Sequence, residues 1–302
     1  MHIPQDLLNG ALCPVTATLS SFGLAGAAWA AYRSREKPDA LHFASVSAFI
    51  FAAQMMNFPI SGGTSGHLLG GVLASALLGV PFGILALALV VAIQAVVFAD
   101  GGLNVLGANI FNMALIGAGL GGLLREWLMQ KLPANGVRIW LATATASWAS
   151  IMLAALACAV ELALDGVLPF STVAPAMLSV HALIGLGEAL ITCLALALFA
   201  YPAVANLPTS RSFAAPALAA LLIALCLSPF ASSLPDGLEA VMEHYQVLHE
   251  AAPLFVTPVA DYQLAGIASE TIATGLAGLI GVLLTFLVAG ALAWPLTRTR
   301  SA

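Results

Sequence analysis

Long runs of apolar residues are the feature that most limits what this chain can fold into. Of its 302 residues, 61% are hydrophobic and only 8% are charged. A helix that crosses a bilayer needs about 20 mostly apolar residues, and several segments reach that length without an internal charge. Shorter segments of alternating hydrophobicity, typical of membrane β-barrels, do not stand out in the sequence. The sequence therefore predicts an all-α polytopic membrane protein.

We expect about nine transmembrane helices. A polar stretch over residues 231–270 separates the first eight of them from the last. The third helix has only about 13 residues, so we expect it to be tilted, half-buried or preceded by a re-entrant segment. The predicted spans cover residues 11–32, 40–57, 67–79, 81–98, 103–123, 139–162, 173–201, 213–230 and 271–294.

The positions of the basic residues predict the orientation of these helices. Lys and Arg are retained on the cytoplasmic side of a membrane. With the N-terminus outside and the C-terminus in the cytoplasm, all basic residues fall on the cytoplasmic side. They are Arg33, Arg35, Lys37, Arg125, Lys131, Arg138, Arg211, Arg298 and Arg300.

The first two residues offer three nitrogen donors. The Met1 amine and the His2 amide nitrogen would close a five-membered chelate ring, and the amide nitrogen and the His2 imidazole Nδ1 would close a six-membered one. Such rings favour a planar ion, and Ni²⁺ or Co²⁺ accepts nitrogen sets of this kind. We expect Met1 to remain on the mature protein. Taken alone, without the residues that could join it, His2 is better explained as an ordinary exposed second residue.

His67 closes a run rich in small residues, from Asn57 to Gly66. Irregular backbone at membrane depth survives only where it lines a cavity or is covered by protein. We therefore expect Thr64 and Ser65 to help orient a ligand near His67. Asn57 could accept the second ring N–H of the His67 imidazole, as ligating histidines usually require. The alternative is a helix-capping turn with an interfacial histidine.

His181 and Glu188 are ionisable residues inside an apolar span. Seven residues separate them, which places them two turns apart on one helix face. An ionisable residue in the bilayer is a functional candidate. The alternative is that Glu188 fixes helix packing by a hydrogen bond within the bundle.

These segments together resemble the CbiM/NikM family, the substrate-capturing membrane (S) components of energy-coupling factor (ECF) transporters for cobalt and nickel. The resemblance covers about residues 1–200 and rests on Met1-His2-Ile3-Pro4, Phe58 to Gly71, Phe98 to Leu103, Leu106 to Met113 and His181 to Thr192. Residues 232–239 and the last helix resemble the small NikN/CbiN (PDGLE) partner, fused to the same chain.

The resemblance implies a seven-helix S-component bundle over residues 1–205 and a NikN/CbiN-like region with two transmembrane helices over residues 206–302. It further implies that Met1, His2 and His67 bind Ni²⁺ or Co²⁺ in a plane of four nitrogens. The chain has no phosphate-binding loop. The resemblance also implies a transmembrane coupling (T) protein and cytoplasmic ATPase subunits as partners, in a cell membrane, with no cofactor beyond the transported ion and no nucleic acid.

Two other functions would depend on His181 and Glu188. A self-contained secondary permease would relay protons through His181 and Glu188, and it would accumulate metal without any ATPase. A membrane enzyme would use the same two residues as a metal-bound catalytic pair, and its turnover would survive an extension of the N-terminus. Capture of the ion by Met1 and His2 would not survive that extension.

Overall fold

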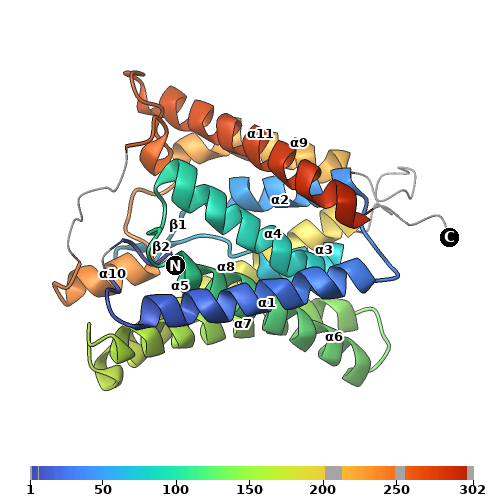
Figure 1. The fold of residues 1–302 in the computed structure, drawn as a ribbon, viewed down its shortest axis with the longest axis horizontal. Coiled ribbons are helices and arrows are strands. Elements are labelled where there is room, and N and C mark those ends of the chain that lie inside the picture. The colour runs from blue at the N-terminus through green and yellow to red at the C-terminus, as the bar shows by residue number, and fades with distance from the viewer. Residues whose placement is uncertain (1, 6, 201–212, 249–255, 298–302) are drawn as a thin grey trace.

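The structure is a computed structural model that describes residues 2–5, 7–200, 213–248 and 256–297. Within these ranges the chain is mostly helical (Figure 1). The helices are α1 (Leu12–Arg33), α2 (Ala40–Gln54), α3 (Gly71–Leu78), α4 (Val80–Ile93), α5 (Leu106–Ile110), α6 (Gly121–Lys131), α7 (Arg138–Leu164), α8 (Phe170–Ala200), α9 (Ala214–Leu222), α10 (Gly237–His244) and α11 (Glu270–Thr297). Short strands β1 (Phe58–Ile60) and β2 (Thr64–Gly66) pair antiparallel.

Three of these helices continue into non-α turns. The π-helical segment η1 (Gln94–Phe98) follows α4, and η2 (Phe111–Leu120) joins α5 to α6. After α9 come the π-helical η4 (Ile223–Leu227) and the 3₁₀ turn η5 (Ser228–Phe230), and a further 3₁₀ turn, η6 (Ala260–Tyr262), precedes α11. Single π turns inside helices often mark functional sites.

The helix α2 lies at the centre of the bundle. Nearly every residue of α2 is buried, as expected of a helix that is apolar on all sides. α9 and α11, from the C-terminal part of the chain, cover one side of α2 (Figure 1). Gly281 of α11 sits so close to Phe51 of α2 that a Cβ at position 281 would overlap the ring. The two parts of the chain therefore share one packed core.

Six described helices are long and apolar enough to cross a membrane. They run Leu12–Arg33, Val80–Phe98, Leu106–Lys131, Arg138–Leu164, Phe170–Ala200 and Glu270–Thr297. Two shorter apolar helices, Ala40–Gln54 and Ala214–Phe230, accompany them. The protein is therefore a multi-pass membrane protein.

The predicted third span, residues 67–79, differs most from the structure. Only Gly71–Leu78 is helical, and a β-hairpin that the sequence pattern did not predict precedes it. Gly62 and Gly63 turn the hairpin at φ 81° and 76°, and Gly70 begins α3 at φ 77°. These positive values suit glycine, which lacks a Cβ. The helix therefore begins later than predicted, at Gly71, and His67 lies on the irregular segment before it.

Candidate metal centre

Hydrogen bonds from Asn109 hold the N-terminal segment inside the bundle. Ile3 N donates to Asn109 Oδ1 at 2.8 Å, and Asn109 Nδ2 donates back to Ile3 O at 3.2 Å. Gly102 N also donates to Ile3 O, at 3.0 Å. Ile3 is fully buried and His2 is 7% exposed. The backbone N–H and C=O of Ile3 are therefore both hydrogen-bonded, as they would be in a β-strand. These bonds hold His2 in the protein interior. Met1 lies outside the described residues.

His67 is held by a backbone segment that two polar side chains fix. Glu188 of α8 accepts the N–H groups of Leu69 and Gly70 at 2.6 and 3.0 Å. Gln54 Nε2, at the end of α2, donates to Leu69 O at 2.8 Å. Because residues 67–70 form no helix, these side chains satisfy backbone groups that would otherwise be costly to bury. Glu188 thus fixes the segment that carries His67.

The imidazoles of His2 and His67 lie against each other. Their ring centroids are 5.5 Å apart, and the ring planes differ by 20°. His2 Nε2 lies 3.1 Å from Gln94 Oε1, and His67 Nδ1 lies 3.0 Å from Leu68 O. Each of these oxygens accepts a hydrogen bond, so each places the ring proton on the nitrogen it faces. In the tautomers that give both of these oxygens a proton, the lone pairs are on His2 Nδ1 and His67 Nε2, and those nitrogens can bind an ion.

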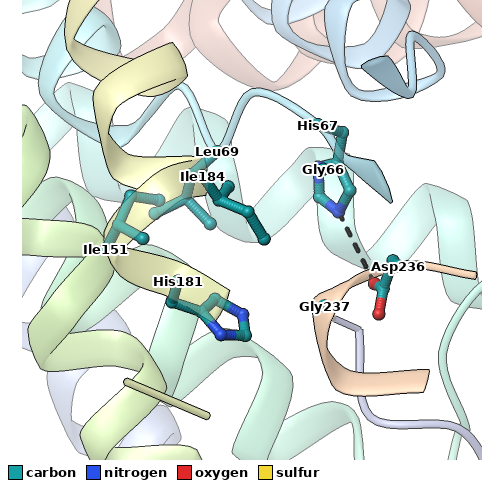
Figure 2. Close-up of a pocket in the computed structure, with 8 residues that line it drawn as sticks. All are labelled: Gly66, His67, Leu69, Ile151, His181, Ile184, Asp236 and Gly237. Carbon is teal, nitrogen blue, oxygen red and sulfur yellow. Dashed lines mark ion pairs between the residues drawn. The ribbon is translucent and has the colours of Figure 1, made fainter. Parts of the chain in front are cut away.

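A carboxylate faces each of those two nitrogens. Asp100 Oδ1 lies 3.3 Å from His2 Nδ1, and Asp236 Oδ2 lies 3.9 Å from His67 Nε2 (Figure 2). Burial lowers the pKa of His2, because a charged imidazole loses hydration inside a protein. Neutral imidazoles near anionic oxygens make a site that attracts a cation.

A cavity of about 370 Å³ reaches both imidazoles. Its charged lining residues are all acidic, and no described Lys or Arg contributes to it. The lining consists of His2, Pro4, Gln54, Met55, Asn57, His67, Ala99, Asp100, Gly101, Asp236, Glu239, Asp261 and Tyr262. Tyr262 donates its hydroxyl proton to Asp100 Oδ2 at 2.5 Å, which holds that carboxylate beside His2.

Asn57, Thr64 and Ser65, which were also predicted as site residues near His67, make other contacts in the structure. Asn57 lines the cavity, but Leu68 O accepts the His67 ring N–H. The hydroxyls of Thr64 and Ser65 donate to Pro235 O and Leu234 O at 3.0 and 2.7 Å. They therefore hold the chain next to Asp236.

His181 lies apart from the wide cavity. It lines a separate void of about 10 Å³ beside His67 and Asp236 (Figure 2). Its Nδ1 donates to Met177 O at 2.8 Å, and among the described residues its buried Nε2 has no hydrogen-bond partner. The void has room for about one water molecule.

The sequence prediction missed Gln94, Asp100, Asn109 and Asp236 as site residues. Gln94, Asn109 and Asp236 are buried, and the first two are amides inside apolar helices. A buried polar side chain needs a partner. An uncharged amide within an apolar span was therefore the signal that could have identified Gln94 and Asn109.

Replacing Asn109 by leucine is expected to lower the affinity for Ni²⁺ by about 10- to 100-fold, the usual cost of losing a group that orients a ligand. Leucine fills a similar volume but removes both bonds to Ile3, which releases the segment carrying His2. Titration calorimetry on the purified full chain measures the change. Asn135→Leu, at an exposed asparagine that does not line the cavity, serves as the control. Equal affinities of Asn109→Leu and the unaltered protein would contradict this role.

Comparison with known proteins identifies the family. Residues 2–207 match the family described as "Cobalt uptake substrate-specific transmembrane region", and residues 210–298 match the PDGLE domain. A putative fused nickel transport protein NikMN of Archaeoglobus fulgidus is 34% identical over 307 residues, covering 99% of this chain and 98% of the relative. A probable fused nickel transport protein LarMN of Lactiplantibacillus plantarum is 31% identical, covering 76% of this chain and 74% of the relative.

A solved structure shares this fold. The crystal structure of a transition metal transporter is 34% identical with a TM-score of 0.57, covering 65% of this chain and 91% of that one. The relatives are named as metal transport proteins rather than enzymes. By the match over two thirds of its length and by its fused nickel transport relatives, the chain belongs to the CbiM family of cobalt and nickel transport proteins.

Proposed function

We propose that this protein captures Ni²⁺ or Co²⁺ as the membrane substrate-binding subunit of an ATP-driven ECF importer. The observation that carries the proposal is the buried, stacked pair of His2 and His67 at an acidic cavity. Late first-row metals prefer imidazole nitrogen to carboxylate oxygen. The names of the relatives, which refer to nickel and cobalt transport, favour the same ions.

The proposed donors are the Met1 amine, the His2 amide nitrogen, the His2 imidazole and the His67 imidazole. His2 Nδ1 is the nitrogen that can close a chelate ring with its own backbone amide, and the bond between His2 Nε2 and Gln94 keeps Nδ1 available. The Met1 amine and the His2 amide nitrogen must lose a proton to bind, whereas the neutral imidazoles already offer a lone pair, so the affinity should fall as the pH is lowered.

We propose nine membrane spans with the N-terminus outside. The described basic residues support this orientation, because Arg33 ends α1, Lys131 ends α6 and Arg138 begins α7, and these helix ends lie on the side of the bundle away from β1 and β2 (Figure 1). Arg125 lines a cavity there with Ser34 and Ala200, and Lys37 Nζ donates to Leu296 O at 2.8 Å. Arg211, Arg298 and Arg300 lie outside the described residues. Retention of basic residues in the cytoplasm would put the metal centre on the outer side.

The proposed partners are a transmembrane coupling protein and cytoplasmic ATPase subunits. The sequence lacks the phosphate-binding loop of an ATPase, so energy for import must come from another subunit. In this proposal residues 1–205 form the capturing bundle and residues 206–302 form the fused region that packs on it.

Inserting one alanine before Met1 is expected to weaken Ni²⁺ binding more than about 100-fold, beyond the cost of losing an outer partner. The insertion moves the amine away from the His2 chelate ring, while the packed core is unchanged. Calorimetry with Ni²⁺, Co²⁺ and Zn²⁺ compares this variant with one that carries the same alanine after Ala302. Full affinity of the N-terminally extended protein would rule out the proposed donor set.

A further inference from the structure

The loop of residues 99–102 packs directly against the N-terminal segment. Gly102 N donates to Ile3 O at 3.0 Å. A Cβ at position 102 would come within 2.5 Å of the Gln5 Cα atom, so only glycine lets the two backbones approach this closely. The position of the loop therefore sets the position of the segment that carries His2.

Tyr262, which belongs to the PDGLE domain, holds the other side of this loop. Its hydroxyl donates to Asp100 Oδ2 at 2.5 Å, and Asp100 N donates to Gln94 O at 3.1 Å. Burial raises the pKa of the Tyr262 hydroxyl well above its usual value, because a phenolate loses hydration inside a protein. The hydroxyl therefore keeps its proton and remains the donor. Hydrogen bonds thus fix both the side chain and the backbone N–H of Asp100.

Tyr262 itself has an unfavourable backbone conformation that its surroundings maintain. Its φ is 56° and that of Asp261 is 50°, values that are rare for a bulky residue. Its ring stacks on Phe98, with centroids 4.9 Å apart and planes 20° apart, and the Phe51 ring lies 6.1 Å away. Strained residues of this kind persist where the surrounding structure holds them, and they cluster at functional sites. The aromatic packing therefore presents the Tyr262 hydroxyl to the loop at a fixed position.

We propose that Tyr262 is a positioning residue of the metal centre. Its bond to Asp100 holds the loop of residues 99–102, and the loop holds the segment that carries His2. The inference rests on the proposed capture of Ni²⁺ or Co²⁺, in which Tyr262 is not itself a ligand. The ring packs without help from the hydroxyl, whereas the hydroxyl makes the bond to the loop. Removing that one hydroxyl should therefore weaken metal binding and leave the fold intact.

Tyr262→Phe removes the hydroxyl and keeps the stacked ring. We expect the affinity of the purified full chain for Ni²⁺, measured by calorimetry, to fall by about 10-fold, as when a group that orients a metal ligand is lost. Tyr245→Phe removes an exposed hydroxyl at the end of α10, which does not line the cavity, and should leave the affinity unchanged. Melting temperatures of the metal-free proteins show whether each variant folds. If Tyr262→Phe and the unaltered protein bind Ni²⁺ equally well, the role of Tyr262 is refuted while metal capture stands.

A double-mutant cycle shows whether Tyr262 acts through Asp100. Asp100→Ala removes the acceptor of the hydroxyl. We expect the double variant Tyr262→Phe/Asp100→Ala to bind Ni²⁺ as Asp100→Ala does, because both changes break the same bond and their effects cannot add. A Tyr262 that only stabilises the fold would give affinity losses that multiply, and that result would overturn the inference. If the unaltered protein binds neither Ni²⁺ nor Co²⁺, the proposed function fails as well.

Gly102→Ala tests the other side of the loop and replaces Tyr262→Phe in the comparison should that variant not fold. The added methyl group would meet the Gln5 backbone, so the affinity for Ni²⁺ should fall by about 10-fold or more. Gly136→Ala is the control, because a Cβ at position 136 has no neighbour within 4 Å. An affinity of Gly102→Ala equal to that of Gly136→Ala would show that the loop does not position the segment that carries His2.

Discussion

Replacing His67 by alanine is expected to abolish measurable Ni²⁺ binding, with an affinity loss well beyond the roughly 100-fold cost of removing an outer partner. The imidazole would supply Nε2 as a donor to the ion while Nδ1 faces Leu68 O, and no other described histidine stacks on His2. Alanine leaves a water molecule as the only replacement. His2→Ala should have an effect of the same size, because it removes the other imidazole of the pair.

The control for this prediction is His244→Ala. His244 is an exposed histidine at the end of α10 and does not line the cavity, so its loss should not change the affinity. Calorimetric titration of the purified full chain with Ni²⁺ measures all three variants. Melting temperatures of the metal-free proteins show whether the fold is retained. If His67→Ala bound Ni²⁺ as tightly as His244→Ala, the site would have to lie elsewhere.

Replacing Glu188 by alanine is expected to have the largest effect on stability. It leaves the N–H groups of Leu69 and Gly70 buried without an acceptor, at a cost of roughly 1–3 kcal/mol for each group. The segment that carries His67 would also lose its support, so Ni²⁺ binding should weaken in parallel. Glu188→Gln keeps one acceptor oxygen, and it should retain most of the stability and most of the binding. Thermal unfolding and calorimetry of the full chain provide the two measurements.

The same pair of variants distinguishes capture from proton-coupled transport. A permease that relays protons through Glu188 would lose metal accumulation in Glu188→Gln, because glutamine does not titrate. The structure gives Glu188 two backbone donors, which is the bonding expected of a group that holds a loop. Accumulation that persists without an ATPase subunit and is destroyed by Glu188→Gln or by a protonophore would contradict the capture hypothesis.

Much of the helical architecture could be predicted from the sequence, because apolar length alone identifies a membrane helix. Spans such as 81–98 and 139–162 agree with Val80–Phe98 and Arg138–Leu164 to within a few residues. The hairpin at Phe58–Gly66 and the late start of α3 could not be predicted from the sequence. They depend on glycines with positive φ and on the hydrogen-bond acceptor that Glu188 provides from a distant helix.

The site itself was only partly accessible to sequence reasoning. His2 and His67 were predicted as ligands, and the structure brings their rings together; their binding of metal remains a prediction. Asp236 was not predicted as a site residue, because it is 169 positions from His67 in the chain and no local sequence pattern connects the two. Its place beside His67 follows from the hydrogen bonds of Ser65 to Leu234 and Pro235, which are tertiary contacts.

The central claim is that a buried pair of imidazoles captures the cation, and X-ray absorption at the nickel edge of the Ni²⁺-loaded full chain tests it most directly. We expect a nickel coordination shell dominated by nitrogen, with the multiple-scattering signal of two imidazoles. Any nickel signal that remains in His67→Ala should contain one imidazole fewer. A shell of oxygen atoms alone, without imidazole scattering, would contradict it.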